Sequence, residues 1–193
     1  MPSLPPVGSS PMADLRKSNS ALKKLLLNSS PSSSPEEDVE RAEMRRIARI
    51  LLRFSLPIDY EDLAHRALAS HWEDITDEQR TEFVGVLRAL ISRNLSKQLY
   101  ELADYDLWFT KESVTGSEAI VDATLEFPYH GGRTRIVMVW KLVYKRGSWV
   151  AYDLIADQQS MLVNYRAEFD KIITNESFDV LLGRMKKRLA KTE

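Results

Sequence analysis

Hydrophobic residues recur at helical spacing in the first half of the chain, alternate along the next fifty residues, and return to helical spacing at the end. The helical pattern predicts helices at about 12–27, 35–56, 59–71, 76–102, 160–174 and 177–189. The alternating pattern predicts strands near Leu107–Val114, Ala119–Tyr129, Arg133–Lys145 and Trp149–Ala156. This order predicts an α+β domain, with a twisted antiparallel sheet of about four strands and helices packed on its apolar face.

Capping signals fix several of the predicted helix starts. Asp59 follows Pro57 and precedes an apolar-periodic run, which is typical of an N-cap. Thr76 and Gln79 have the spacing of a capping box, in which each residue satisfies a backbone amide of the other. Ser160 is the expected cap of the helix behind the last strand. These helix starts are therefore predicted from local sequence alone.

Two short connections predict how the strands pair. Gly131-Gly132 and Arg146-Gly147 suit two-residue hairpins, which make the sheet an antiparallel meander. This register places Phe127 opposite Ile136 and Trp140 opposite Asp153. One face is then broad and apolar, with the residues Val121, Ala123, Leu125, Phe127, Ile136, Met138, Trp140, Leu142, Ala151 and Ile155. Such a face forms either a filled core or the wall of a pocket, and periodicity does not distinguish the two.

The N-terminal residues differ in composition from the rest. Residues 1–11 and 28–35 are rich in Pro and Ser, so residues 1–34 are expected to be a flexible segment with one short helix. Residues 35–190 form the expected folded domain. Met1–Pro11 lacks the basic and apolar regions of a signal peptide, and no apolar run approaches the roughly 18 residues of a membrane span.

Composition excludes several classes of chemistry. The formal net charge of −1 lacks the positive excess typical of nucleic-acid-binding proteins, so nucleic acid is not expected as a partner. The chain has no Cys, which excludes disulfides, a thiol nucleophile and Cys-based zinc sites. The three His residues lack metal-site spacing, and no nucleophile elbow or phosphate loop occurs. No metal, cofactor or catalytic residue is therefore expected.

The segment from Gly147 to Phe169 carries a family resemblance. Trp149, the pair Tyr152-Asp153 and Ser160 resemble the C-terminal signature of the MlaC-type periplasmic phospholipid-binding proteins, the toluene-tolerance family. Earlier and later motifs also fit, and they are Pro57–Ala64, His71-Trp72, Thr76, Glu78-Gln79, Phe83, Ile172-Ile173, Phe178-Asp179 and Leu181-Leu182. The resemblance covers roughly residues 36–190. Gln158-Gln159 departs from the small residues usual there.

The resemblance implies a carrier rather than an enzyme. It implies a sheet of the nuclear-transport-factor type with added helices, a phospholipid as cargo, and a periplasmic location. Its implied partners are an inner-membrane ABC transporter complex and an outer-membrane lipoprotein complex, and a monomer is expected. The candidate lipid-binding residues are the ten of the apolar sheet face and, from the helices, Phe83, Leu87, Leu90, Ile91, Met161, Tyr165 and Phe169.

Two alternative functions stay open on the sequence. A small-ligand enzyme or binding module on a similar curved sheet would use Asp153, on the apolar face, as a general base. An interaction domain with a fully packed core would need no ligand. A structural hydrogen bond is the expected role of Asp153, because a buried carboxylate needs a partner. A basic cluster of Arg133, Arg135, Lys141, Lys145 and Arg146 is expected to be solvated surface.

Overall fold

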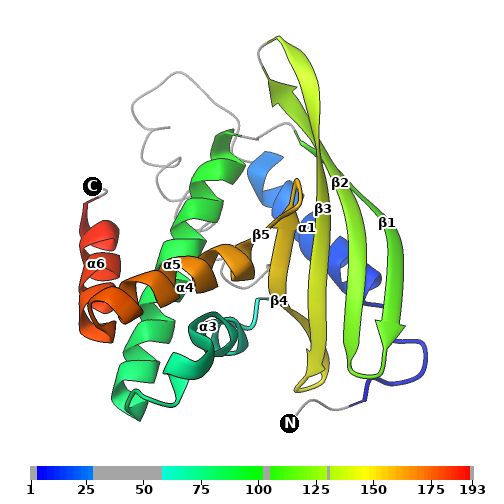
Figure 1. Cartoon of the computed structure of the whole chain (residues 1–193). Coiled ribbons are helices and arrows are strands. Elements are labelled where there is room, and N and C mark those ends of the chain that lie inside the picture. Colours follow the sequence, from blue (N-terminus) through cyan, green and yellow to red (C-terminus); the bar gives the residue numbers. More distant parts are fainter. Residues whose placement is uncertain (1–3, 28–57, 102–104, 130, 192–193) are drawn as a thin grey trace.

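A computed structural model describes residues 4–27, 58–101, 105–129 and 131–191. Its sheet has five antiparallel strands in the order β1-β2-β3-β4-β5 (Figure 1). The strands are β1 Asp106–Thr115, β2 Glu118–Tyr129, β3 Gly132–Lys145, β4 Ser148–Ala156 and β5 Gln159–Ser160. The helices are α1 Pro11–Leu27, α3 Tyr60–Leu68, the 3-10 helix η1 Ala69–Trp72, α4 Asp77–Glu101, α5 Met161–Asn175 and α6 Phe178–Ala190. The predicted α+β class and antiparallel meander are confirmed.

The four predicted strands are all present, and each begins one residue before its predicted start. The fifth, β5, has two residues and pairs with the end of β4. A strand of two residues has no period, so the alternation of the sequence gives no signal for it.

The predicted helix caps are confirmed. The Asp59 side chain accepts a hydrogen bond from the Asp62 amide, and Thr76 and Gln79 bond reciprocally through side chain and backbone. Ser160 accepts from the Val163 amide at the start of α5. These helix starts follow from residues three positions apart, which is why the sequence predicts them.

The register between β2 and β3 differs from the prediction by two residues. Leu125, and not Phe127, lies opposite Ile136, and the hairpin closes with the pair Tyr129 and Gly132. Gly131 has φ +80°, in the left-handed region that glycine adopts easily, and it is the last residue of the hairpin loop. Gly132, which was predicted to lie in the loop, belongs to the strand. A shift of two leaves every side chain on its predicted face, because the side-chain period of a strand is two residues.

A bulge in β4 overturns another part of the predicted register. Leu142 pairs with Ala151 as expected, but Lys141 pairs with Asp153, which leaves Tyr152 as an extra residue. Beyond the bulge Trp140 therefore faces Leu154 instead of Asp153. Ile155 pairs with Val139 and lies on the opposite face from Trp140. The prediction that Asp153 and Ile155 belong to the apolar face is wrong.

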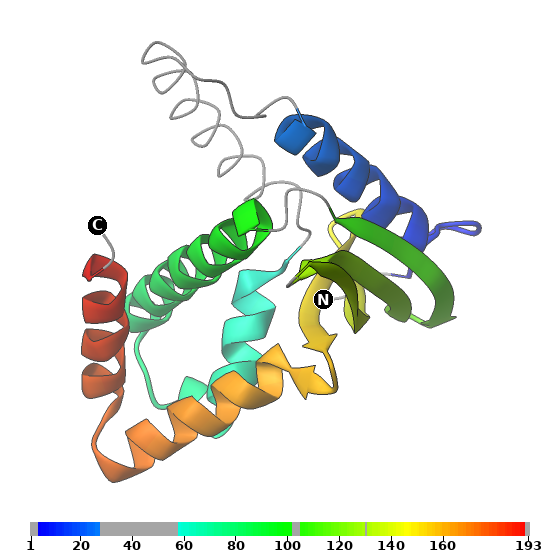
Figure 2. The same ribbon diagram turned by 90° about the horizontal axis from the view of Figure 1, so that it is seen from above.

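Two hydrophobic clusters form the core. The sheet cluster joins buried residues of the four long strands to Leu15 of α1, and the helical cluster joins α3, α4, α5 and α6. Figure 2 shows α1 beside β1 and β2, and α3 and α5 grouped at the β4 end of the sheet. Ile58 packs against both clusters. The core is therefore continuous at the junction between β4 and the start of α3.

The predicted N-terminal helix is confirmed as α1, and it packs onto the sheet through Leu15, which is 3% exposed. The predicted helix at 35–56 and the Ser/Pro-rich break before it lie outside the described residues. The division of the chain at residues 34 and 35 falls there too, so it stays a prediction.

Candidate functional site

The apolar face of the sheet has a closed part and an open part. In the closed part Val121, Ala123, Trp140, Leu142 and Ala151 are each at most 4% exposed. Leu15 of α1 and Ile58 cover this region. These positions are buried, as strand positions under a packed helix should be.

The open part lies toward the β2–β3 hairpin. Leu125 and Phe127 on β2, and Ile136 and Met138 on β3, share the face of Val121 and Trp140. All four are only half-buried. Four large apolar side chains in adjacent positions form a surface suited to an apolar ligand. The structure thus brings nine of the ten predicted sheet residues to one face and removes only Ile155.

The predicted helix residues form a separate wall. Phe83, Leu87, Leu90, Ile91 and Phe169 are buried in the helical cluster. Phe169 stacks on Tyr165, with ring centroids 5.3 Å apart, and meets Phe83 edge-on at 5.4 Å. Met161 and Tyr165 are partly buried against the same cluster. Thirteen of the seventeen predicted residues therefore divide between the two clusters, and the other four, Leu125, Phe127, Ile136 and Ile155, belong to neither.

A pocket of about 200 Å³ lies between α4, α5 and α6. Leu90, Tyr165 and Phe169, all predicted site residues, line it, and Arg184 and Arg188 also contribute. Burial raises the pKa of the Tyr165 phenol above its ordinary value. The pocket is only slightly larger than a single aromatic ring needs, since an engineered cavity of ~150 Å³ holds benzene. It is too small for a phospholipid.

Two buried side-chain nitrogen atoms of the described residues have no hydrogen-bond partner. They are Nε1 of Trp140, in the sheet cluster, and Nε of Arg88, on α4. Buried polar groups are almost always paired, so each exception needs an explanation. Arg88 is not among the site residues predicted from the sequence. Its only signal is a cation placed directly after Leu87, at the edge of the apolar stripe of α4.

Asp153 has the structural role that the sequence predicts for it. Its carboxylate accepts hydrogen bonds from the Ser160 hydroxyl at 2.8 Å and from the Leu162 amide at 3.0 Å, and it is 1% exposed. Lys141 Nζ lies 3.8 Å away. A carboxylate with these partners is engaged at the start of α5, which disfavours the general-base alternative.

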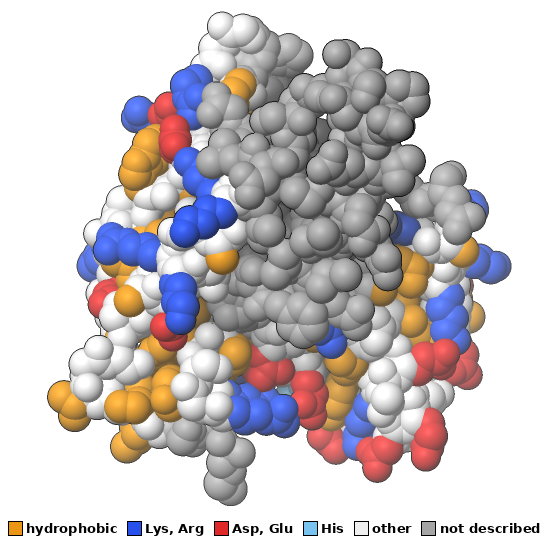
Figure 3. Space-filling model, turned by 180° about the vertical axis from the view of Figure 1, so that it is seen from behind, with side chains coloured by type: hydrophobic (Ala, Val, Ile, Leu, Met, Phe, Trp, Pro, Cys, Tyr) orange, Lys and Arg blue, Asp and Glu red, His pale blue; other side chains and the backbone are white. Residues whose placement is uncertain are grey.

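The predicted basic cluster is paired with carboxylates rather than forming a single positive patch. Lys145 bonds to Asp59 at 2.8 Å, and Arg146 lies 4.0 Å from Glu61. Figure 3 shows acidic and basic side chains interspersed over the described surface seen from behind. Burial alone would raise the pKa of Asp59, but the hydrogen bonds from Lys145 and the Asp62 amide hold it below its ordinary value.

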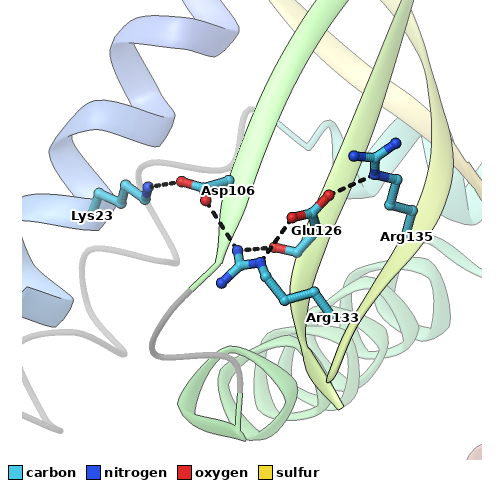
Figure 4. Close-up of polar contacts among 5 residues, drawn as sticks. All are labelled: Lys23, Asp106, Glu126, Arg133 and Arg135. Carbon is cyan, nitrogen blue, oxygen red and sulfur yellow. Dashed lines mark hydrogen bonds and ion pairs between the residues drawn. The ribbon is translucent and has the colours of Figure 1, made fainter. Parts of the chain in front are cut away.

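A network of five charged residues joins α1 to three strands (Figure 4). Asp106 accepts from Lys23 at 2.9 Å and from Arg133 at 3.0 Å, and Glu126 accepts from Arg133 and Arg135. The hydrogen bond from Lys23 lowers the pKa of Asp106, and those from Arg135 and Arg133 lower that of Glu126. The network therefore fastens the end of α1 to the sheet beside its apolar face.

The described residues lack two features, a metal site and a membrane-spanning helix. No group of three or more His, Asp and Glu residues within these ranges is arranged to hold a metal ion. No helix among the described elements is both long and apolar enough to cross a membrane.

Fold and site together define the class of protein: an α+β domain whose antiparallel sheet presents one apolar face, half closed by helices and half open. Comparison with known proteins places the chain within this class. The family model described as MlaC protein matches residues 31–187, and the chain belongs to that family.

Individual relatives agree with this assignment. The intermembrane phospholipid transport system binding protein MlaC of Haemophilus influenzae is 21% identical over 130 residues, which are 66% of this chain. This chain spans 61% of the length of that relative. A structure of the phospholipid-binding protein from Ralstonia solanacearum, in complex with a phospholipid, superposes with a TM-score of 0.77 at 13% identity. The superposition covers 95% of this chain and 98% of the Ralstonia chain, and it shows that the two proteins share a fold.

Proposed function

We propose that this protein binds a phospholipid by its acyl chains and carries it as a component of a lipid transport system. The open part of the apolar sheet face, Leu125, Phe127, Ile136 and Met138, is the observation that carries the proposal. The fold shared with the phospholipid-bound Ralstonia protein supports it, and so does the likeness to the phospholipid transport protein of Haemophilus influenzae.

The physical chemistry of the face suits acyl chains. Burying one methylene group stabilises a complex by about 0.8 kcal/mol, so a single fatty-acyl chain supplies ample affinity without polar contacts. Release into water would lose all of this free energy. Transfer therefore requires a partner that opens the site or offers another apolar surface.

The wider setting follows from family membership and is part of the proposal. The protein works in the periplasm as a monomer and exchanges phospholipid with an inner-membrane ABC transporter complex and an outer-membrane lipoprotein complex. The cargo is the only bound molecule that this role needs. No bond is made or broken, and the engaged carboxylate of Asp153 supports this view.

Adjacent residues of β3 give a matched test of the binding face. Ile136 lies half-buried on the apolar face, and Val137 is 62% exposed on the opposite face. Gentle purification followed by native mass spectrometry is expected to show phospholipid in the wild type and in Val137→Asp. Ile136→Asp is expected to lose it at least tenfold, because a carboxylate in contact with acyl chains is strongly disfavoured.

Thin-layer chromatography of an organic extract identifies the lipid class. A wild-type protein that carries no phospholipid, and takes none up from vesicles, contradicts the proposed function. An equal loss of bound phospholipid in Ile136→Asp and Val137→Asp contradicts the assignment of the lipid-binding face.

A further inference from the structure

The two unpartnered buried nitrogens share a chemical character. Trp140 Nε1 and Arg88 Nε both carry hydrogen and can only donate. Among the described residues no buried side-chain oxygen is left without a partner. A buried hydrogen-bond donor without a partner costs free energy. The two N–H groups therefore suit a ligand that supplies hydrogen-bond acceptors and no donors.

Comparable groups in the same regions find partners within the chain. Trp149, also buried in the sheet cluster, donates its indole N–H to Ser9 Oγ at 2.8 Å. Arg93, one turn beyond Arg88 on α4, donates to the backbone oxygens of Leu189 and Arg188. Trp140 and Arg88 are therefore exceptions to a pattern that their neighbours follow.

Arg88 carries a charge that no carboxylate of the described residues balances. Its guanidinium carbon lies 5.5 Å from the ring centroid of Tyr60, and this is its one recorded side-chain interaction among the described residues. The side chain is half-buried. A partly desolvated guanidinium favours an anion with planar or tetrahedral oxygens, and phosphate is the usual choice.

One junction of the fold joins the two clusters that the donors contact. Ile58 forms a bridge with Ala151, and the Asp59 amide donates to the Ala151 carbonyl at 2.8 Å. Ala151 pairs with Leu142, two positions from Trp140 on the same face of β3. The guanidinium of Arg88 lies against the ring of Tyr60, the first residue of α3 and a member of the helical cluster. The two donors thus belong to the two clusters that meet at Ile58.

We infer that Arg88 and Trp140 are the polar contacts for the bound phospholipid, Arg88 for its phosphate and Trp140 for an acyl ester carbonyl. The inference rests on the proposed function. The ester and phosphate groups of a diacyl phospholipid present acceptors and no donors, which is the complement of the two orphaned N–H groups. An indole is a neutral donor and suits a neutral carbonyl, whereas the cation suits the charged group.

Ester-linked and ether-linked phosphatidylglycerol of the same chain length separate the two contacts, because the ether lipid keeps the phosphate but lacks the carbonyls. Trp140→Phe keeps a ring and removes the donor. It is expected to weaken binding of the ester lipid about tenfold and to leave binding of the ether lipid within twofold of the wild type. Trp149→Phe, the matched control, should leave the ratio of the two affinities unchanged.

Arg88→Gln is expected to weaken binding of both lipids about tenfold, and added salt should weaken wild-type binding more than it weakens binding to this variant. Arg93→Gln is the control on the same helix and should show neither effect. Thermal unfolding of each delipidated variant verifies that the comparison is made between folded proteins.

A spectroscopic readout on the wild-type protein avoids any dependence on variant folding. In ¹⁵N-labelled protein the indole N–H resonance of Trp140 should move downfield when the delipidated protein is loaded with ester lipid, and that of Trp149 should not. An unmoved Trp140 resonance, or variants that bind both lipids like the wild type, overturns the inference and leaves phospholipid binding intact. A wild-type protein that binds neither lipid contradicts the proposed function instead.

Discussion

The carboxylate of Asp153 lies 2.8 Å from the hydroxyl of Ser160, which itself caps α5 by accepting from the Val163 amide. This pair joins the last long strand to the helix behind it. The bulge at Tyr152 turns Asp153 away from the face of Trp140 and toward Lys141. One extra residue in a strand therefore decides whether this carboxylate faces the apolar site or supports a helix start.

Asp153→Ala should lower the free energy of unfolding by about 2–3 kcal/mol, because it leaves the partly buried Ser160 hydroxyl and the Leu162 amide without their acceptor. Urea denaturation of the delipidated protein measures the effect. Asp122→Ala is the control, since Asp122 has no ion pair within the described part of the chain and should change stability by less than about 0.5 kcal/mol. A loss below 1 kcal/mol for Asp153→Ala would contradict the structural role.

The pair Asp59 and Lys145 should make stability depend on acid. The pKa of Asp59 is lower in the folded protein than its ordinary value, so its contribution is complete above about pH 4 and is lost as pH falls through the folded pKa. Asp59→Asn keeps a good helix cap but removes the charge. The variant should be about 1–2 kcal/mol less stable than the wild type at pH 7. The difference in free energy of unfolding between the two proteins should become smaller at pH 3. An unchanged difference would show that the charge of Asp59 is unimportant for stability.

Glu112 should hold the start of α1 against the sheet. It accepts from the Ser10 hydroxyl at 2.9 Å and from the Met12 amide at 3.0 Å. Glu112→Ala removes this N-terminal anchor, which is worth about 1 kcal/mol. Amide hydrogen exchange in residues 13–21 should become several-fold faster. Glu118→Ala, on the neighbouring strand and 3.9 Å from Arg66, should leave exchange in α1 unchanged. Equal exchange rates in both variants would contradict the role of Glu112 in holding α1.

Phe169 tests whether the helical wall is core or ligand surface. It is 2% exposed and contacts the rings of Phe83 and Tyr165. Phe169→Ala should lower the free energy of unfolding by about 3–4 kcal/mol in delipidated protein, the range for a large buried ring. Val163→Ala on the same helix, 59% exposed, should cost less than about 0.5 kcal/mol. A small loss for Phe169→Ala would instead place this ring beside a ligand cavity.

Local signals in the sequence predicted much of this fold. Asp59, Thr76 and Ser160 cap their helices because a cap involves residues only two or three positions apart. The face of the sheet was also predicted from alternation, and it survived a two-residue error in the β2–β3 register because the strand period is two. Periodicity therefore predicts which side chains share a face better than it predicts which ones are opposite.

Features that depend on neighbouring strands or distant helices were not predictable. The bulge at Tyr152 arises from the fit of β4 to β3, and it moved Ile155 off the apolar face. The missing partner of Trp140 Nε1 is visible only when all surrounding groups are placed. Arg88 gave almost no signal, because its neighbours on α3 are unknown until the helices are packed.

The sequence by itself determined the α+β class, the helix starts and the apolar character of one sheet face, since these depend on local spacing and on the alternation of side chains. The tertiary structure decided which part of that face is closed by Leu15 and Ile58, and which part, around Ile136, is half-open. It also decided that the predicted basic cluster is paired with carboxylates. Burial and charge pairing are set by residues far apart in the chain, and only the packed fold brings them together.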